Sequence, residues 1–220
     1  MKVTCVIPTY NHAATLAKVV NDLQNVVDQI VVVDDGSNDD TKDVLSDLPV
    51  DVLSHLVNRG QGAALRTGTI HALRSGADII VHFDADGQFR VEDIEKVIEP
   101  IRSQIADIVF GSRFLDSTTK MPGFKKKVIM PLARLVNRVF LNIKLSDPQS
   151  GFRAFSRRAA EKIDWSQDRM AHCSEILVVA HRSDLPLTEV PITVLYHDFG
   201  QRFSGGFKIL RDLFLAKMNN

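Results

Sequence analysis

The sequence predicts an α/β protein built as one domain around a mostly parallel sheet. Two observations lead to this prediction. Short apolar segments alternate with segments whose apolar residues recur at helical spacing, a pattern typical of parallel sheets with helices on both faces. The apolar segments are nearly continuous, as strands buried on both faces are. The length of 220 residues is enough to bury the core of one such domain.

The strands and helices follow in order from the apolar pattern. Each strand is a short apolar run, the first ending at a proline and the second at two aspartates. Each helix begins after a polar or glycine-rich segment. The strands are expected at residues 3–8, 29–35, 50–56, 77–83 and 106–113, and the helices at 14–27, 38–48, 59–73 and 91–101.

Composition limits the classes of function. The chain is 45% hydrophobic and 25% charged, which is ordinary for a globular protein, and its formal net charge of zero argues against a nucleic-acid partner. Cys5 and Cys173 lack metal-ligand spacing, so we expect two free thiols in a reducing compartment. The N-terminus enters a strand without a signal peptide, and no apolar stretch approaches the roughly 18 residues of a membrane span. These features predict a cytoplasmic protein.

Polar side chains follow the strands, at the edge where open parallel sheets bind ligands. Carboxylates or arginines come after all but one of the five predicted strands. The glycine-rich stretch RGQGAALRTG contains neither the GK[ST] of a P-loop nor a GxGxxG motif, so it supports neither nucleotide-binding fold. The residues after the strands are Pro8, Tyr10, Asn11, Asp34, Asp35, Asn58, Arg59, Asp84, Asp86, Gln88 and Arg113.

The segment HFDADGQF, residues 82–89, has two interpretations. Asp and Gly favour turns, so the segment could be a solvated turn. In an extended chain, however, alternate side chains point the same way, and Asp84, Asp86 and Gln88 would converge as three oxygen ligands on one hard cation. These residues alone leave both interpretations open.

Six short motifs indicate which class of protein the chain resembles. VIPTYN, VVDDGSNDDT, NRGQGAALRTG, FDADGQ, FGSRF and DPQSGFRAFS occur in this order, within a match that extends from residue 3 to about residue 192. The series resembles the family 2 inverting glycosyltransferases, in particular the branch that transfers mannose or glucose to dolichol or polyprenol phosphate. The resemblance implies one glycosyltransferase A-type domain, in which residues 1–115 bind the nucleotide sugar and residues 116–220 form an acceptor-side lobe.

The resemblance also implies roles for individual residues. The first motif and the second aspartate of VDDGS hold the nucleotide base and ribose, which assigns Pro8, Tyr10 and Asp35. The DxDxQ motif holds Mg²⁺ or Mn²⁺ against the donor diphosphate, and such a cation suits the negative charge that develops on this leaving group. This motif assigns Asp84, Asp86 and Gln88 to the metal, and Asp84, Ala85 and Asp86 to the donor.

The acceptor site is inferred from charge. An acceptor phosphate is already ionised near neutral pH, so transfer to it requires cations and positioning instead of a base. Arg113 suits that role. The resemblance adds Arg202 and Lys208 of RFSGGFK, which match a phosphate-clamping run of the family and could instead be ordinary surface cations. Asp147 of DPQSGFR is either the base of a hydroxyl-acceptor enzyme or a residue that orients the acceptor lobe, and Glu175 has the same ambiguity.

The chain departs from the family pattern at three positions. His12 stands where a carboxylate is common after PTYN, and Gln61 stands where lysine is common in the glycine-rich loop. Phe207 replaces a serine in the C-terminal phosphate-clamping run. The first departure leaves the identity of the base undetermined, so the donor is described only as GDP-mannose or UDP-glucose in type.

A basic segment predicts contact with a membrane surface. Residues 117–146 include seven Lys or Arg residues and no acidic residue before Ser146, and their apolar residues recur at helical spacing. This pattern suits an interfacial helix on anionic lipid, and residues 205–218 offer a second. Both could instead be ordinary core helices. We expect peripheral attachment to the cytoplasmic face of a membrane, and the resemblance adds a membrane-spanning partner subunit as another route.

Two other functions fit the same family resemblance. One is transfer to a hydroxyl group of a saccharide, and the other is a catalytically silent assembly subunit. The intact Asp84, Asp86 and Gln88 set argues against a silent subunit. The basic segment and DPQSGFR favour a lipid-phosphate acceptor over a hydroxyl acceptor.

Overall fold

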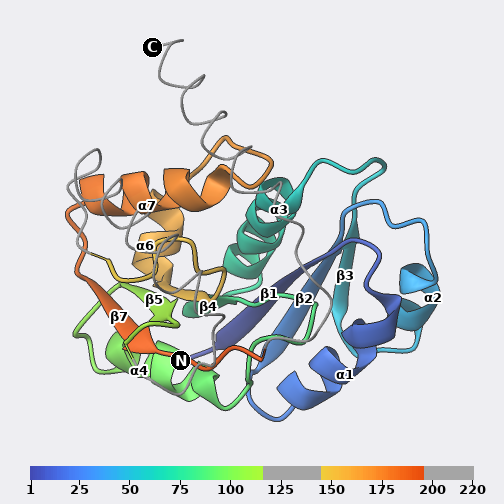
Figure 1. Cartoon of the computed structure of the whole chain (residues 1–220), viewed down its shortest axis with the longest axis horizontal. Helices are drawn as coiled ribbons and strands as arrows, with labels where there is room; N and C mark the ends of the chain where they lie inside the picture. The colour runs from blue at the N-terminus through green and yellow to red at the C-terminus, as the bar shows by residue number, and fades with distance from the viewer. Residues whose placement is uncertain (116–144, 196–220) are drawn as a thin grey trace.

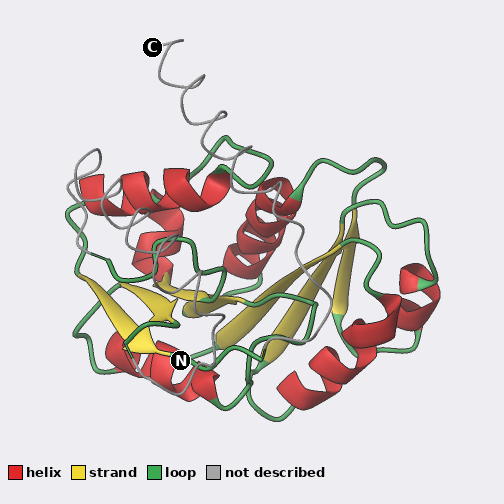
Figure 2. Ribbon diagram, viewed as in Figure 1, coloured by secondary structure: helices red, strands yellow, loops and turns green. Residues whose placement is uncertain are grey.

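One sheet with helices on both faces forms the centre of the molecule (Figures 1 and 2). The computed structural model describes residues 1–115 and 145–195, and within them the sheet has seven strands. The strands are Val3–Thr9 (β1), Gln29–Asp34 (β2), Asp51–Ser54 (β3), Ile79–His82 (β4), Ile108–Ser112 (β5), Arg153–Ser156 (β6) and Leu187–Pro191 (β7). They lie in the order β3-β2-β1-β4-β6-β5-β7.

Strand β6 is the exception to parallel pairing. It runs antiparallel to both β4 and β5, whereas the other paired strands are parallel. Phe155 of β6 pairs with Ile80 of β4 on one side and with Ile108 of β5 on the other. The predicted mostly parallel sheet is confirmed. The sequence analysis did not predict that part of the DPQSGFRAFS motif forms a strand of this sheet.

The helices divide between the two faces of the sheet (Figure 1). Because side chains alternate along a strand, Cys5 and Ile7 of β1 belong to one hydrophobic cluster and Val6 to the other. The first cluster is covered by Ala13–Leu23 (α1), Thr41–Ser46 (α2) and Asp93–Arg102 (α4), and the second by Gln61–Arg74 (α3), Arg157–Lys162 (α6) and His172–Arg182 (α7).

Helix α3 packs closely on strand β1 at Gly68. A Cβ atom at Gly68, in the middle of this helix, would stand 2.3 Å from Cγ1 of Val6 in β1. The absence of a side chain at Gly68 therefore sets the distance between α3 and the strand beneath it. The first turn of α3 lies beside the carboxyl end of β4, where Gln61 contacts Asp84.

Several predicted boundaries are too long. The third strand ends at Ser54 and not at residue 56, because β3 is an edge strand that pairs only with β2. The first helix ends at Leu23, and Val26 and Val27 continue as a turn that packs against the core. The second helix spans only Thr41–Ser46.

Some predictions fall outside the described residues. These are Arg202, Lys208 and the two amphipathic segments, within 117–146 and at 205–218. The structure does not describe residues 116–144 and 196–220. In the described ranges, no helix has the length and apolar character needed to cross a bilayer. Cys5 and Cys173 are buried and do not form a disulfide, which confirms the predicted free thiols.

We expect Gly68→Ala to lower the free energy of unfolding. Alanine is favoured over glycine in a helix interior by about 1 kcal/mol, but overpacking a core costs about 1–3 kcal/mol. Because of the collision with Val6, the overpacking cost should exceed the gain in helix propensity. Urea denaturation measures the net change in the free energy of unfolding. Ile70→Ala on the exposed side of α3 is the control, because it creates no such collision. An increase in stability for Gly68→Ala would show that α3 can move away from β1 at little cost.

Candidate active site

The loops after β1 and β2 are joined by hydrogen bonds. The backbone N–H of Asn11 donates to Oγ of Ser37 at 2.9 Å, and that of Asn38 donates to Oδ1 of Asn11 at 2.9 Å. Asn11 has a φ of +58°, a left-handed conformation that asparagine tolerates better than most residues. Of the predicted donor-binding residues here, Tyr10 is 39% exposed and Pro8 is buried within β1. The first two motifs therefore form one surface with Tyr10 accessible on it.

Asp35 holds the loop that follows β3. Its Oδ1 accepts hydrogen bonds from the backbone N–H of Arg59 at 3.0 Å and lies 2.6 Å from Nδ1 of His55. Its Oδ2 accepts from the backbone N–H of Gly60 at 2.6 Å. The carboxylate is buried, so its described contacts order the loop entering α3. A contact between Asp35 and the nucleotide stays a prediction.

The DADGQ segment is a turn, so the extended-chain argument for its three ligands is wrong. Gly87 has a φ of +72°, and Oδ1 of Asp86 accepts a hydrogen bond from the backbone N–H of Gln88 at 3.0 Å. The hydroxyl of Thr15 in α1 fixes the turn by donating to the carbonyl of the buried Ala85 at 2.7 Å. Side chains at alternate positions are therefore not aligned by strand geometry. A turn and a metal site are nevertheless compatible.

Asp84 is an electrostatically unusual carboxylate. Burial is the main cause that raises its pKa to about 7, and the Asp86 and Cys173 side chains raise it further. Arg153 and His172 act in the opposite direction. The amide Nε2 of Gln61 donates to Oδ1 of Asp84 at 2.7 Å. Asp86 is thus close enough to Asp84, at the carboxyl end of β4, to act on its charge.

This carboxylate pair fits a divalent cation. A cation beside Asp84 and Asp86 would offset the repulsion that raises the Asp84 pKa. Mg²⁺ is usually held by one or two carboxylates together with substrate phosphates. In the described part of the chain, no three His, Cys, Asp or Glu side chains gather as a metal-binding group. Asp84 and Asp86 are therefore candidate ligands for such a cation, and the Gln88 side chain as a third ligand stays a prediction.

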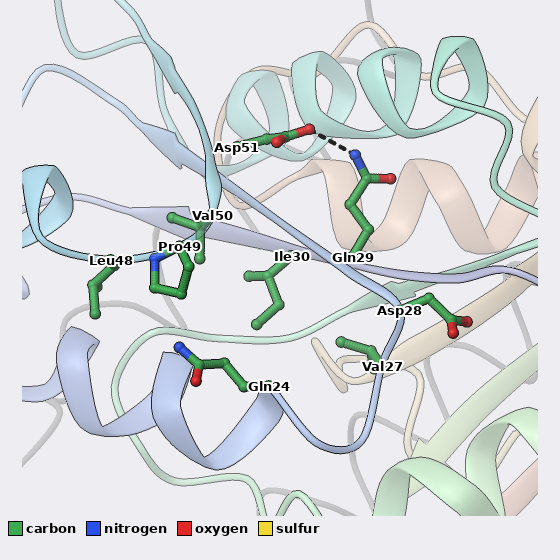
Figure 3. Close-up of a pocket in the computed structure, with 9 residues that line it drawn as sticks. All are labelled: Gln24, Val27, Asp28, Gln29, Ile30, Leu48, Pro49, Val50 and Asp51. Carbon is green, nitrogen blue, oxygen red and sulfur yellow. Dashed lines mark hydrogen bonds between the residues drawn. The ribbon is translucent and has the colours of Figure 1, made fainter.

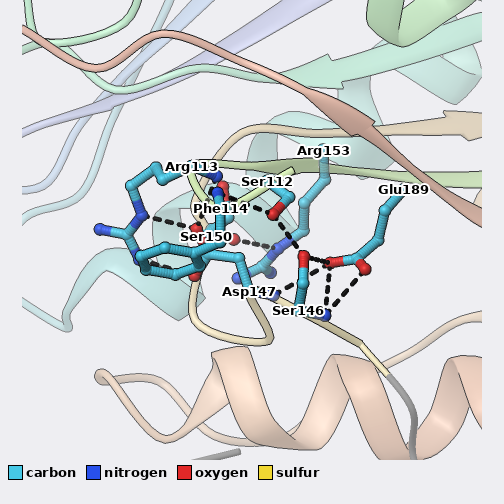
Figure 4. A network of polar contacts seen from close by, with 8 residues as sticks. All are labelled: Ser112, Arg113, Phe114, Ser146, Asp147, Ser150, Arg153 and Glu189. Carbon is cyan, nitrogen blue, oxygen red and sulfur yellow. Dashed lines mark hydrogen bonds and ion pairs between the residues drawn. The ribbon is translucent and has the colours of Figure 1, made fainter. Parts of the chain in front are cut away.

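Arg113 and Asp147 form a bidentate ion pair (Figure 4). Nε of Arg113 donates to Oδ2 of Asp147 at 2.6 Å and Nη2 donates to Oδ1 at 2.7 Å. The Arg113 backbone N–H also donates to Oδ2, at 3.1 Å. Asp147 is fully buried. These contacts hold the Arg113 guanidinium in place. The two predicted roles of Asp147, as a base and as a residue that orients the acceptor lobe, stay predictions.

Glu189 of β7 completes this network and was missed by the sequence analysis. Its carboxylate accepts hydrogen bonds from the backbone N–H of Ser146 at 2.8 and 2.9 Å and from that of Asp147 at 3.0 Å. Figure 4 shows Glu189 and Arg113 on opposite sides of the turn that carries Asp147. The turn is therefore fixed to both β5 and β7. A lone glutamate in a short strand gives no sequence signal for this role.

Arg153 is a fully buried cation beneath the site. Its Nε donates to the carbonyl of Ser150 at 2.8 Å, whereas Nη1 and Nη2 have no hydrogen-bond partner among the described residues. Burial opposes ionisation of Cys173, yet Arg153 and His172 together lower the pKa of that thiol to about 6.

Glu175 lies in the first turn of α7 and is hydrogen-bonded to the preceding loop. Its carboxylate accepts hydrogen bonds from the backbone N–H groups of Ser166 at 3.0 Å and Gln167 at 2.8 Å. These contacts explain Glu175 as a structural residue that holds a loop against its helix.

A pocket of about 450 Å³ lies away from all six motifs (Figure 3). It is lined at the amino ends of β2 and β3 by residues such as Gln24, Gln29 and Asp51. Ligands of open parallel sheets bind at the opposite edge, beyond the carboxyl ends of the strands. We therefore place the candidate site at the motif loops and not in this pocket.

Comparison with known proteins finds similar sequences. Residues 4–164 match the sequence model described as glycosyl transferase family 2. The chain is 36% identical, over 97% of its length and 95% of the relative, to UDP-N-acetylglucosamine–dolichyl-phosphate N-acetylglucosaminyltransferase of Methanococcus voltae. It is 30% identical, over 95% of its length and 83% of the relative, to polyprenol monophosphomannose synthase of Mycolicibacterium smegmatis.

Solved structures show the same fold. One is glucosyl-3-phosphoglycerate synthase from Mycobacterium tuberculosis in complex with Mg²⁺ and uridine diphosphate. The similarity has a TM-score of 0.76 and covers 99% of this chain and 78% of that one, at 18% identity. At this identity the similarity concerns the fold alone.

We expect Asp147→Asn to lower the free energy of unfolding by about 3 kcal/mol, because breaking a buried ion pair costs roughly 3–5 kcal/mol. Urea denaturation measures the change. Asp164→Asn is the matched control: Asp164 also forms a bidentate pair, with Arg66, but both side chains are exposed, so the expected loss is below about 1 kcal/mol. Wild-type stability together with abolished turnover in Asp147→Asn would favour the base role instead.

Proposed function

The chain belongs to glycosyl transferase family 2, and we propose that it transfers a hexose from a nucleotide sugar to the phosphate of a dolichol or another polyprenol. The observation that carries the proposal is the Asp84 and Asp86 pair at the carboxyl end of β4, beside the joined loops of β1 and β2. The relatives support the acceptor, since one is named for dolichyl phosphate and the other for polyprenol monophosphomannose.

The donor is assigned to the first half of the chain, residues 1–115. Tyr10 is exposed beside the loop that follows β2, and it is proposed to contact the base and ribose together with Pro8 and Asp35. A donor of the GDP-mannose or UDP-glucose type is proposed. The named relatives differ in the sugar they transfer, so their names support a hexose or a hexose derivative without selecting one.

Asp84 and Asp86 are proposed to hold Mg²⁺ or Mn²⁺, with Gln88 as a further ligand. The bound cation would neutralise negative charge on the departing diphosphate. The fit rests on two adjacent carboxylates whose mutual repulsion a cation would relieve. Ala85 is proposed to bring its backbone close to the donor, since its carbonyl is fixed by Thr15.

The acceptor phosphate is assigned to Arg113, Arg202 and Lys208. Asp147 fixes the guanidinium of Arg113 at the end of β5. In the proposed displacement, a phosphate oxygen bonds to the anomeric carbon while the bond from that carbon to the donor diphosphate breaks, so the configuration inverts. The diphosphate takes the electron pair. The acceptor is already ionised, so no base has to remove a proton.

Peripheral contact with a membrane is proposed because the acceptor carries a lipid chain. Leu56 is fully exposed and Val57 is 67% exposed on the loop that joins β3 to α3. This loop lies at the carboxyl edge of the sheet and also carries Arg59, whose side chain is half exposed. Apolar side chains beside a cation suit the boundary between lipid headgroups and acyl chains.

The acceptor proposal predicts a requirement for phosphate on the lipid. With a panel of radiolabelled nucleotide sugars, we expect transfer to a short polyprenyl phosphate and none to the corresponding polyprenol. Excess chelator should abolish transfer, and Asp86→Asn should reduce it by at least about 100-fold while leaving the urea-unfolding midpoint unchanged. Equal transfer to the polyprenol would support the hydroxyl-acceptor alternative, and full activity in chelator would remove the metal from the proposal.

The membrane proposal predicts that the double variant Leu56→Ser/Val57→Ser co-sediments more weakly than wild type with vesicles containing anionic lipid. The change removes apolar area that would enter the interface. Ile105→Ser is the matched control, because Ile105 is 70% exposed but lies before β5, at the amino edge of the sheet.

Raising the salt concentration should weaken vesicle binding further, since exposed charges are screened within about 10 Å at 0.1 M salt. Changing Lys125, Lys126 and Lys127 to alanine tests the basic segment separately. Equal sedimentation of wild type and the Leu56/Val57 double variant would show that this loop does not reach the bilayer.

A further inference from the structure

Asp84 is held from two sides by residues distant in sequence. On one side, Nε2 of Gln61, the first residue of α3, donates to Oδ1 of Asp84 at 2.7 Å. On the other side, a Cβ atom at Gly151 would lie 2.8 Å from Oδ2 of Asp84. A side chain at Gly151 would therefore displace the carboxylate. Gln61 thus anchors one oxygen of Asp84, and the missing side chain at Gly151 leaves room for the other.

Gln61 can act in this way because the first turn of α3 is itself fixed. The indole Nε1 of Trp165 donates to the carbonyl of Gly62 at 2.9 Å, and the backbone N–H of Ala63 donates to the carbonyl of Asp168 at 3.1 Å. A Cβ atom at Gly62 would stand 2.2 Å from the carbonyl oxygen of Gln167. The helix terminus is therefore tightly packed against the loop before α7, and the Gln61 amide starts from a fixed backbone.

Gly151 is fixed by a different network. It ends the turn that begins at Asp147, whose side chain pairs with Arg113 and whose backbone N–H donates to Glu189. Arg153, two residues further on, lies in β6 between β4 and β5. Gln61 and Gly151 consequently approach Asp84 from different parts of the chain, the start of α3 and the turn before β6.

We propose that Gln61 and Gly151 are positioning residues that orient the Asp84 carboxylate for a divalent cation, an inference that rests on the metal site of the proposed function. Outer residues that hydrogen-bond to a metal ligand fix its orientation, and their loss typically costs about 10–100-fold in metal affinity or activity. The Gln61 side chain that orients Asp84 is also uncharged. Its amide donates a hydrogen bond and adds no positive charge that would compete with a cation beside Asp84 and Asp86.

The test measures Mn²⁺ binding in the absence of turnover. Free Mn²⁺ is quantified by electron paramagnetic resonance during titration of the full chain, with and without uridine or guanosine diphosphate. Gln61→Met removes the donor at nearly constant side-chain length, and we expect its Mn²⁺ affinity to fall by about 10-fold. Gly151→Ala should reduce the affinity at least as much, because it displaces the carboxylate directly.

Gln29→Ala is the matched control. Nε2 of Gln29 also donates to an aspartate, Oδ2 of Asp51, at 2.6 Å, but this contact lies at the pocket on the opposite edge of the sheet (Figure 3). Its Mn²⁺ affinity should equal that of wild type. Urea unfolding of each variant separates positioning from misfolding, and Gln61→Met serves where Gly151→Ala proves unstable.

The outcomes separate the inference from the proposed function. Wild-type Mn²⁺ affinity in a folded Gln61→Met variant would overturn the positioning role while leaving the metal site intact. Absence of Mn²⁺ binding in wild type itself, with and without nucleotide, would overturn the metal site and the inference with it. Reduced affinity in Gln61→Met and Gly151→Ala but not in Gln29→Ala would support both.

Discussion

The insertion of β6 between β4 and β5 is the constraint on which the site depends. Strand β4 carries Asp84 and Asp86 just beyond its carboxyl end, whereas β6 begins just after Gly151. Because β6 runs antiparallel to β4, the start of one strand lies beside the end of the other, with Arg153 paired to His82. This single pairing brings the DPQSGFR motif against the DADGQ turn, although 58 residues of sequence lie between them.

Charge near the turn is balanced mainly by residues that the substrate is not proposed to contact. Arg153 is buried and opposes the rise of the Asp84 pKa, while Cys173 adds to that rise. At the end of β5, Asp147 holds Arg113 and is itself held through its backbone by Glu189. The anionic and cationic parts of the site are thus each built on a buried partner of opposite charge. Such partners cost free energy to bury, but they restrict the geometry of the groups in front of them.

The sequence predicts the regular parts of this structure well, because they depend on local apolar pattern. The first five strands and the helices between them are recognisable from runs such as QIVVVD, and the errors are confined to their ends. The site is predicted less completely. The motifs identify Asp84, but its contacts with Gln61 and Gly151 depend on strand order, which periodicity does not contain. The DADGQ geometry was wrong for a local reason: Gly87 adopts a positive φ, and a turn replaces the extended chain. Glu189 and Cys173 carry no local signal at all.

The strand order also has a consequence for the timing of folding during synthesis. Strands β1, β2 and β3 are neighbours in both sequence and space, so they can pair as soon as they leave the ribosome. Strand β5 has only β6 and β7 as neighbours in the described sheet, and it must wait for residues 153–191. At roughly 5–20 residues per second, that delay is on the order of 4 to 16 seconds. During that interval the apolar run IVF of β5 is available to chaperones, so the nascent chain has a defined period of vulnerability to aggregation.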